Sequence, residues 1–260
     1  MLKDSIKLGQ LPNLRKLLIP DPGYVIVDMD LDRADLQIVV WEADDKDLKY
    51  ALKNNVDIHL LNASSIWELN LPVDELINTH PNYPNHAQKW KVYRHKAKMS
   101  CHAMNYGVRA RKLAQALGIT VHEAELLIKK WFGAHPGFLS WHKRIESDLA
   151  QTRSVTNKFG YRRYYFDRME TVFTKALAWT PQSTVAIVIN KALNNISNNL
   201  KQVDLLLQVH DSLTFQIPIG AKARLLEEVK KQSLITIPYD DPLVIPVGFA
   251  ESLSSWGDCK

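Results

Sequence analysis

Two aspartates from distant parts of the chain stand at the ends of apolar strand patterns, where a carboxylate can hold a metal ion. Asp30 comes near the end of YVIVDMDL, residues 24–31, and Asp211 follows His210 at the tip of a hairpin predicted over 203–217. Acidic side chains at the end of a buried strand are costly unless they are paired or bind a cation. Two such carboxylates suit a two-metal phosphoryl-transfer site, because Mg²⁺ prefers oxygen ligands and shares the phosphates of its substrate.

Each aspartate also has a structural explanation that involves no metal. Aspartate is common in tight turns, which accounts for Asp211, and Asp30 or Asp32 can cap the helix that the sequence predicts from residue 32 onward. Either segment taken alone leaves this explanation open. Together, the two segments favour a shared metal site.

A second group of chemically useful side chains recurs every four residues and therefore forms one stripe on a helix. The group is Arg94, Lys98, His102 and Tyr106. An apolar stripe elsewhere on the same helix comprises Ala97, Cys101, Met104 and Val108. Arg and Lys neutralise phosphates, and the two rings offer stacking surfaces, so the first stripe suits a nucleoside triphosphate. The alternative is a solvated basic face that carries two incidental rings.

Arginines and tyrosines are interleaved in segment 152–166, TRSVTNKFGYRRYYF, which turns at Gly160. In this setting Arg162 and Arg163 fit contact with a nucleic-acid backbone. Edge strands are also commonly rich in Arg and Tyr, so the pattern permits a structural explanation as well.

The elements that position these side chains alternate between strand and helix patterns. A proline-punctuated lead-in over 1–23 precedes the first strand, and residues 45–84 hold one or two helices and a loop. A helix is predicted over 85–106, with Asn85 as its cap and Gly107 as its stop. The next helix follows Thr120, which forms a capping box with Glu123, and another runs from Gly137 to about Ala150. The last two helices are predicted over 182–196, after Pro181, and over 221–233. A final apolar run covers 243–249.

The composition is that of an ordinary globular protein with ample material for a core. The 260 residues are 46% hydrophobic and 23% charged, which suggests one large domain or two intimate ones. A net charge of +5 is compatible with a nucleic-acid partner but does not require one. Cys101 and Cys259 form no disulfide framework, which suits a reducing cytosol. No signal-peptide core and no apolar run near ~18–20 residues is present, so we expect no membrane partner.

In their order and separation, these motifs resemble the polymerase core of the family A, or DNA polymerase I-like, DNA polymerases, in particular the phage members. DMDLDRADL (28–36) resembles the first metal-binding motif, with its Asp at Asp30, and QVHDS (208–212) the third, with its Asp at Asp211. The stripe ending in Tyr106-Gly107 resembles the signature of the mobile fingers helix. Further family-like segments are FGYRRY (159–164), PQST (181–184) and GFAESLSSWGD (248–258).

The resemblance implies an α+β fold, in which a palm of mostly antiparallel sheet backed by helices carries an inserted α-helical fingers subdomain. It implies palm segments at 1–44 and 176–260 and fingers at 45–175. Because the chain starts just before the first-motif strand, we expect no thumb, no exonuclease domain and no upstream Thr-Gly-Arg element. We expect a separate polypeptide to supply the thumb and exonuclease portions.

The resemblance also implies template-directed addition of dNTPs to a primer 3′ end. Asp30 and Asp211, helped by the Leu31 carbonyl, would hold two Mg²⁺ ions, with Mn²⁺ as the alternative metal. Lys98 and Arg94 would bind the triphosphate, and Lys98 would also supply a proton to pyrophosphate. The other implied nucleotide-binding residues are His102, Tyr106 and Asp35. The implied contacts to primer–template DNA are Arg162, Arg163, Gln182 and His210.

Three departures from the family pattern leave alternatives open. His102 stands where the family has Phe or Tyr, Asp35 where it has Glu, and Ser212 where a Glu commonly follows the motif Asp. Ser212 and the expected lack of a thumb favour a non-catalytic DNA-binding or assembly module as the second interpretation. A metal-dependent phosphohydrolase is the third, but the basic and aromatic stripe has no purpose in it.

Overall fold

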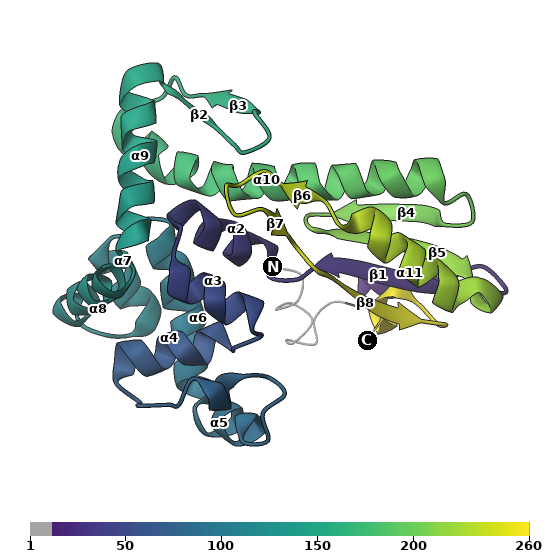
Figure 1. The fold of residues 1–260 in the computed structure, drawn as a ribbon, viewed down its shortest axis with the longest axis horizontal. Coiled ribbons are helices and arrows are strands. Elements are labelled where there is room, and N and C mark those ends of the chain that lie inside the picture. The colour runs from purple at the N-terminus through teal and green to yellow at the C-terminus, as the bar shows by residue number, and fades with distance from the viewer. Residues whose placement is uncertain (1–11, 260) are drawn as a thin grey trace. The chain divides into compact units, whose positions relative to one another are not determined.

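A computed structural model describes residues 12–259, in which helices and antiparallel strands combine in an α+β fold (Figure 1). The α-helices are α2 Ala34–Ala43, α3 Lys46–Lys53, α4 Ile58–Trp67, α5 Tyr83–Lys89, α6 Lys91–Asn105, α7 Ala110–Leu117, α8 Val121–Ala134, α9 Pro136–Thr152, α10 Met169–Asn199 and α11 Lys222–Ser233. The strands are β1 Tyr24–Leu31, β2 Ser154–Thr156, β3 Arg162–Tyr164, β4 Asp204–Val209, β5 Ser212–Pro218, β6 Thr236–Ile237, β7 Leu243–Val244 and β8 Val247–Ser252. Short 3-10 turns are η1 Leu14–Leu17, η2 Asp74–Leu76, η3 Ile219–Ala221 and η4 Trp256–Asp258. The first eleven residues of the predicted lead-in lie outside the described residues.

The chain divides into two compact units, and helix α10 belongs to both. The first unit runs to Ala34 and resumes at Ser183, and the second is Asp35–Gln182. The first contains the sheet and the second is mostly helical. The predicted palm and fingers limits, after residue 44 and after residue 175, stay a prediction.

The sheet of the first unit has the strand order β4-β5-β1-β8, with every neighbouring pair antiparallel. Central strand β1 buries Val25, Ile26, Val27 and Met29. Helices back the sheet, since Ser233 of α11 donates to the Met29 sulfur at 3.2 Å and Gln208 of β4 donates to Asn190 of α10 at 2.9 Å. The predicted antiparallel sheet backed by helices is confirmed.

Capping side chains fix several helix starts in the second unit. Thr120 Oγ1 accepts from the Glu123 backbone N–H at 3.2 Å, and the Glu123 carboxylate accepts from the Thr120 backbone, so the predicted capping box of α8 is present. Asp45 caps α3 by accepting from the Leu48 N–H at 2.9 Å. The core behind these caps contains the fully buried rings of Trp131, Phe138 and Trp141.

The single helix predicted over 85–106 is wrong, because two helices, α5 and α6, occupy this segment. The chain leaves helical angles at Trp90, with φ −105° and ψ 17°, while the Trp90 ring packs edge-on to Tyr93 at a centroid distance of 5.8 Å. The first helix begins after Asn82 and not at the predicted cap Asn85. Pro84 in its first turn favours this earlier start, because proline is pre-set for a helix N-terminus.

The helix predicted to begin after Pro181 is also wrong at its start. Helix α10 begins at Met169 and carries Pro181 in its interior. Proline removes one backbone hydrogen bond and crowds the preceding turn. Val172, Ala176 and Leu177, which precede the proline in α10, are buried. Their packing outweighs the cost of a proline inside the helix.

Two sequence-level expectations concern thiols and membranes. Cys101 and Cys259 are both free. Within residues 12–259, no helix combines the length and the apolar character needed to cross a bilayer.

Candidate active site

The two predicted metal-binding aspartates lie on neighbouring segments of one sheet. Asp30, the penultimate residue of β1, pairs with Ser212 at the start of β5. The Leu31 backbone N–H donates to the Asp211 carbonyl at 3.2 Å. Because adjacent strands are about 4.7–4.9 Å apart, this register brings the backbones of Asp30 and Asp211 together at one end of the sheet.

A tight turn of two residues, His210 and Asp211, presents the second aspartate. Val209 and Ser212 close the turn as a register pair, and the Ser212 hydroxyl donates to the Val209 carbonyl at 2.9 Å. His210 has φ +56°, in the left-handed region that favours glycine. A histidine held at such an angle stores strain, a feature that recurs at functional sites.

The donor set at this end of the sheet consists of oxygens from Asp30, Asp211 and the backbone. Among the described residues, no group of three or more His, Cys, Asp or Glu side chains could hold a metal ion. A pair of carboxylates nevertheless fits Mg²⁺, because this ion keeps several water ligands and fills the rest of its coordination shell with substrate phosphates. The oxygen donors therefore suit a hard divalent cation that binds together with a phosphorylated substrate.

Helix α6 in the second unit carries the stripe predicted to bind a nucleoside triphosphate. Lys98 and His102 are exposed, whereas Arg94 and Tyr106 are half-buried. A separate, buried face contains Ala97, Cys101 and Met104, whereas Val108, which was predicted to continue this apolar stripe, lies beyond the end of the helix and is only half-buried. Tyr106 ends the helix, and Gly107 follows with φ +70°, a left-handed angle that suits glycine after a helix.

A buried carboxylate that the sequence analysis missed holds Arg94. The Arg94 Nε donates to Asp57 Oδ2 at 2.6 Å, and the Tyr83 hydroxyl donates to the same oxygen at 2.9 Å. The other oxygen, Oδ1, caps α4 by accepting from the His59 and Leu60 backbone N–H groups at 3.0 and 3.1 Å. The Asp57 side chain is only 4% exposed. Burial raises its pKa, but these donors, led by Arg94, bring the pKa below the usual 3.8.

Three of the predicted nucleotide-binding residues contact one another. The Tyr106 hydroxyl donates to Asp35 Oδ1 at 2.5 Å, and His102 Nδ1 lies 3.6 Å from Asp35 Oδ2. The His102 and Tyr106 rings meet edge-on with centroids 5.0 Å apart. Burial, reinforced by the Asp35 charge, raises the pKa of Tyr106, so its hydroxyl stays a hydrogen-bond donor.

The four residues predicted to contact DNA are all exposed, and they lie on three different elements. Arg162 and Arg163 project from β3, where the Arg162 Nε donates to the Thr156 hydroxyl at 3.1 Å. Gln182 lies on α10, directly after Pro181. His210 occupies the hairpin turn of the first unit.

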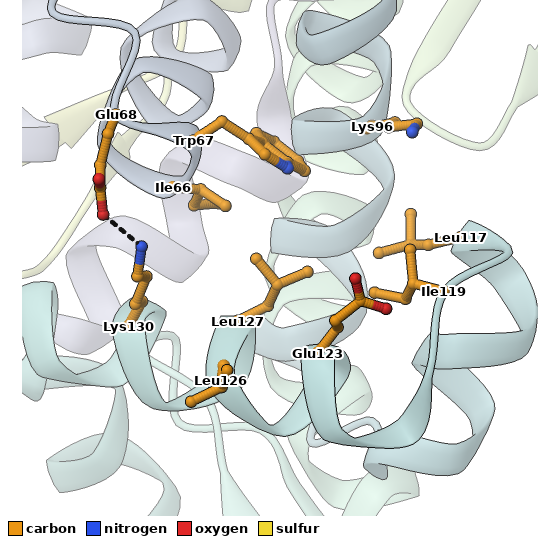
Figure 2. A pocket seen from close by; sticks show the side chains of 10 residues that line it. All are labelled: Ile66, Trp67, Glu68, Lys96, Leu117, Ile119, Glu123, Leu126, Leu127 and Lys130. Carbon is orange, nitrogen blue, oxygen red and sulfur yellow. Dashed lines mark hydrogen bonds and ion pairs between the residues drawn. The ribbon is translucent and has the colours of Figure 1, made fainter.

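A pocket of about 350 Å³ in the second unit is separate from these residues (Figure 2). Its lining residues, all within the described part of the chain, include none of the predicted site residues: Ile66, Trp67, Glu68, Lys96, Leu117, Ile119, Glu123, Leu126, Leu127 and Lys130. Residues two apart on a helix point about 200° apart, so Lys96 and Lys98 face different sides of α6. The pocket therefore lies away from the predicted nucleotide stripe.

Comparison with a family model decides the classification of the chain. Residues 5–255 match the model of DNA polymerase family A. This chain belongs to DNA polymerase family A. The family inferred from the short motifs is confirmed, and the match extends over almost the whole sequence.

Curated bacterial DNA polymerases of this family are similar to the chain at low identity. The chain is 27% identical over 250 residues to the thermostable DNA polymerase I of Thermus filiformis, covering 93% of this chain and 28% of that protein. It is 24% identical over 265 residues to DNA polymerase I of Pseudomonas aeruginosa, covering 97% of this chain and 27% of that protein. The family A chain thus spans little more than a quarter of these relatives. The phage-type assignment stays a prediction.

A solved family A structure has the same fold. The POL domain of Pol1 from M. smegmatis, in complex with DNA primer-template and dNTP, superposes with a TM-score of 0.78 at 23% identity. The match covers 94% of this chain and 42% of that chain. The predicted polymerase fold, with its antiparallel sheet and helices, is therefore confirmed.

Proposed function

We propose that this chain is the catalytic portion of a template-directed DNA polymerase that adds dNTPs to a primer 3′ end. The observation that carries the proposal is the register of Asp30 beside Ser212 and Asp211 within a family A chain. Two carboxylates at one end of a sheet are the protein groups that nucleotidyl transfer by two metal ions requires.

Asp30, Asp211 and the Leu31 carbonyl would hold two Mg²⁺ ions, with Mn²⁺ as the alternative metal. When bound, these ions would activate the primer 3′-hydroxyl and stabilise the pyrophosphate leaving group. The two aspartates would contribute oxygen donors held by β1 and by the turn before β5, two strands with buried interiors. Preorganised donors of this kind avoid the cost of ordering the site when substrate arrives.

The α6 stripe would bind the incoming nucleotide. Lys98 and Arg94 would neutralise the triphosphate, and Lys98 would donate a proton to the departing pyrophosphate. Asp57 holds the Arg94 guanidinium from the buried side, so Arg94 can present its remaining N–H groups without searching rotamers. His102 would stack against the nucleotide.

Asp35 and Tyr106 would select the sugar of the nucleotide. The hydroxyl of Tyr106 holds Asp35 in place, and a fixed carboxylate beside the sugar would obstruct a ribose 2′-hydroxyl. Arg162, Arg163, Gln182 and His210 would contact the primer–template, mostly through phosphates. Sequence information would then come from the template and not from base-edge readout by the protein.

A non-catalytic DNA-binding module is the second candidate. The observation that favours it is Ser212, whose hydroxyl closes the turn at 2.9 Å and brings no charge to the site. The expectation of a second polypeptide that supplies a thumb rests on the family resemblance alone. Both points are tested by the same experiment.

Primer extension on a recessed primer–template, with Mg²⁺ and dNTPs at low salt, tests the proposal. We expect templated extension by the parent chain, alone or with a thumb-bearing chain added, and loss of extension in Asp30→Ala and Asp211→Ala with DNA binding retained. Asp28→Asn is the matched control, because Asp28 lies on the same strand as Asp30. In the parent chain Asp28 Oδ1 accepts from the Thr214 hydroxyl at 2.9 Å, and an asparagine oxygen can still accept this hydrogen bond.

Comparable extension by the parent and both alanine variants would rule out the two-metal assignment. DNA binding by the parent without any extension, even after a thumb-bearing chain is added, would favour the non-catalytic module. Extension only after that addition would support the expected partner chain.

A further inference from the structure

An exposed stripe of one arginine and two aromatic rings runs along the hairpin β2–β3 and its continuation. Thr156 pairs with Arg162 and Ser154 with Tyr164, so Arg162 and Tyr164 alternate onto one face. Phe166 follows two residues later, after the Tyr165 backbone N–H has donated to the Arg153 carbonyl at 2.8 Å.

The exposure of the two rings is not explained by packing within the chain. Phe166 is 91% exposed and Tyr164 is 54% exposed. Two neighbouring residues, Val155 and Tyr165, are buried and anchor the segment, whereas Arg163, the cross-strand partner of Val155, is exposed. The segment therefore packs through these two side chains and leaves the rings of Tyr164 and Phe166 in water.

Hydrogen bonds at the tip of the hairpin fix the shape of its turn. Buried Asn157 accepts through Oδ1 from the Phe159 and Tyr161 backbone N–H groups, both at 3.1 Å. Gly160 takes φ +84° in the same turn. A rigid support matters because exposed rings on a mobile loop would lose conformational entropy on binding.

The charges around the stripe identify the kind of partner. From Arg153 to Arg168 the sequence has five basic side chains and one acidic one, Asp167. The Asp167 carboxylate accepts from Lys175 Nζ at 3.1 Å, which offsets its charge. A rigid, basic surface with exposed rings complements a polyanion that also offers flat apolar faces.

We propose that Tyr164 and Phe166 form a stacking platform for unpaired bases of single-stranded DNA, with Arg162 contacting the adjoining phosphate. Every base has a π-face, so such a platform binds without sequence preference. This inference rests on the proposed polymerase function, which requires an unpaired template strand. Neither ring was among the residues predicted to contact DNA.

Fluorescence anisotropy of a short labelled oligothymidylate with the full chain tests the platform. We expect Phe166→Ala and Tyr164→Ala each to raise the dissociation constant about tenfold. Phe166→Trp keeps the parent affinity, whereas Phe166→Leu, which stays apolar but cannot stack, behaves like the alanine variant. Tyr50→Ala is the matched control, because Tyr50 is a 62% exposed ring elsewhere in the same unit.

Two further readouts separate stacking from charge and from catalysis. A 2-aminopurine base in the oligonucleotide is quenched on binding to the parent and less so with Phe166→Ala. Arg162→Ala reduces the slope of log affinity against log salt by about 0.7, whereas the ring variants leave the slope unchanged. Asp211→Ala, inactive under the proposed function, binds the oligonucleotide as the parent does.

Equal affinity of the parent and both ring variants overturns the platform, as does the absence of oligonucleotide binding by the parent. Full primer extension by the parent alongside either result leaves the polymerase proposal intact. If the parent binds the oligonucleotide through both rings but does not extend a primer, the platform is supported and the proposed catalysis is rejected.

Discussion

Arg94 and Asp57, 37 positions apart in sequence, form a 2.6 Å ion pair in which the carboxylate is buried and the guanidinium is half-exposed. One aspartate thereby caps α4 and positions an arginine of α6. The start of one helix and the orientation of an arginine that we propose to bind nucleotide therefore depend on the same carboxylate.

Removal of that carboxylate should affect both properties. We expect Asp57→Ala to lower the free energy of unfolding by about 2 kcal/mol, because α4 loses its cap and Arg94 loses its partner. Urea unfolding measures this change, and the KM for dNTP in primer extension should rise. Asp57→Asn keeps the cap acceptor and should lose less stability. Unchanged unfolding of Asp57→Ala would contradict the structural role.

The same pair predicts a pH dependence in acid. Because the pKa of folded Asp57 lies below 3.8, its charge contributes stability that is fully present above the unfolded pKa and is lost as the pH falls through the folded pKa. The difference in unfolding free energy between the parent and Asp57→Asn should therefore shrink below about pH 4. A difference that stays constant from neutral pH into this range would exclude the ionised carboxylate as its source.

Lys98 and Lys96 provide a matched pair on α6. Lys98→Ala should raise the dNTP KM about 10- to 100-fold, the cost of one charged hydrogen bond, with DNA affinity nearly unchanged. Lys96→Ala should leave both values close to the parent, since Lys96 lines the separate pocket. Steady-state kinetics with a fixed primer–template distinguishes the two variants. Equal KM values for dNTP in the two variants would show that the α6 stripe does not bind the nucleotide.

Tyr106→Phe removes the hydroxyl that holds Asp35. We expect about a tenfold fall in the preference for dNTP over rNTP, measured as the ratio of kcat/KM values, because the carboxylate is no longer fixed. Tyr93→Phe is the control on the same helix, where the ring packs edge-on to Trp67 and Trp90. Unaltered sugar preference in Tyr106→Phe would show that this hydrogen bond does not serve selection.

The left-handed backbone at His210 predicts a stability difference that is independent of catalysis. His210→Gly should be about 1 kcal/mol more stable than His210→Ala, because only glycine adopts φ +56° without a steric cost. Urea denaturation of the two variants gives the comparison directly. Equal stability would mean that the turn relaxes when the histidine is replaced.

The thiols should differ from free cysteine in their reactivity. Burial raises the pKa of Cys101 to about 12, and burial with the Asp28 charge raises that of Cys259 to about 11. At about pH 8 the native chain should label slowly with a disulfide reagent, with half-buried Cys259 ahead of Cys101. Mass spectrometry identifies the order, and in urea both should label quickly. Rapid native labelling of Cys101 would contradict its enclosure.

Elements whose pattern is local were predictable from the sequence. Strand β1 and the hairpin around Asp211 have alternating or continuous apolar runs, and the α8 cap has a Thr-Glu pair at the required spacing. The two faces of α6 follow from its four-residue period. The family motifs then placed Asp30, Asp211 and the α6 stripe in one expected site.

Features that depend on tertiary packing were not predictable in this way. The partner of Arg94 is Asp57, the N-cap residue that precedes α4, and the sequence there signals a helix cap but not an ion pair with α6. The break at Trp90 has no Pro or Gly to signal it in the sequence, and we find no packing contact that explains it. Helix α10 continues through Pro181 because apolar side chains before the proline are buried. The rule that proline ends a helix does not take such packing into account.

The two faces of α6 separate substitutions that threaten folding from substitutions that alter chemistry. Ala97, Cys101 and Met104 are enclosed, whereas Lys98 and His102 are open to solvent. A library randomised at the enclosed positions would lose folded protein, and one randomised at the open positions would keep it. Under the proposed function, laboratory evolution of nucleotide preference can therefore work on the outward residues of α6 without first stabilising the scaffold.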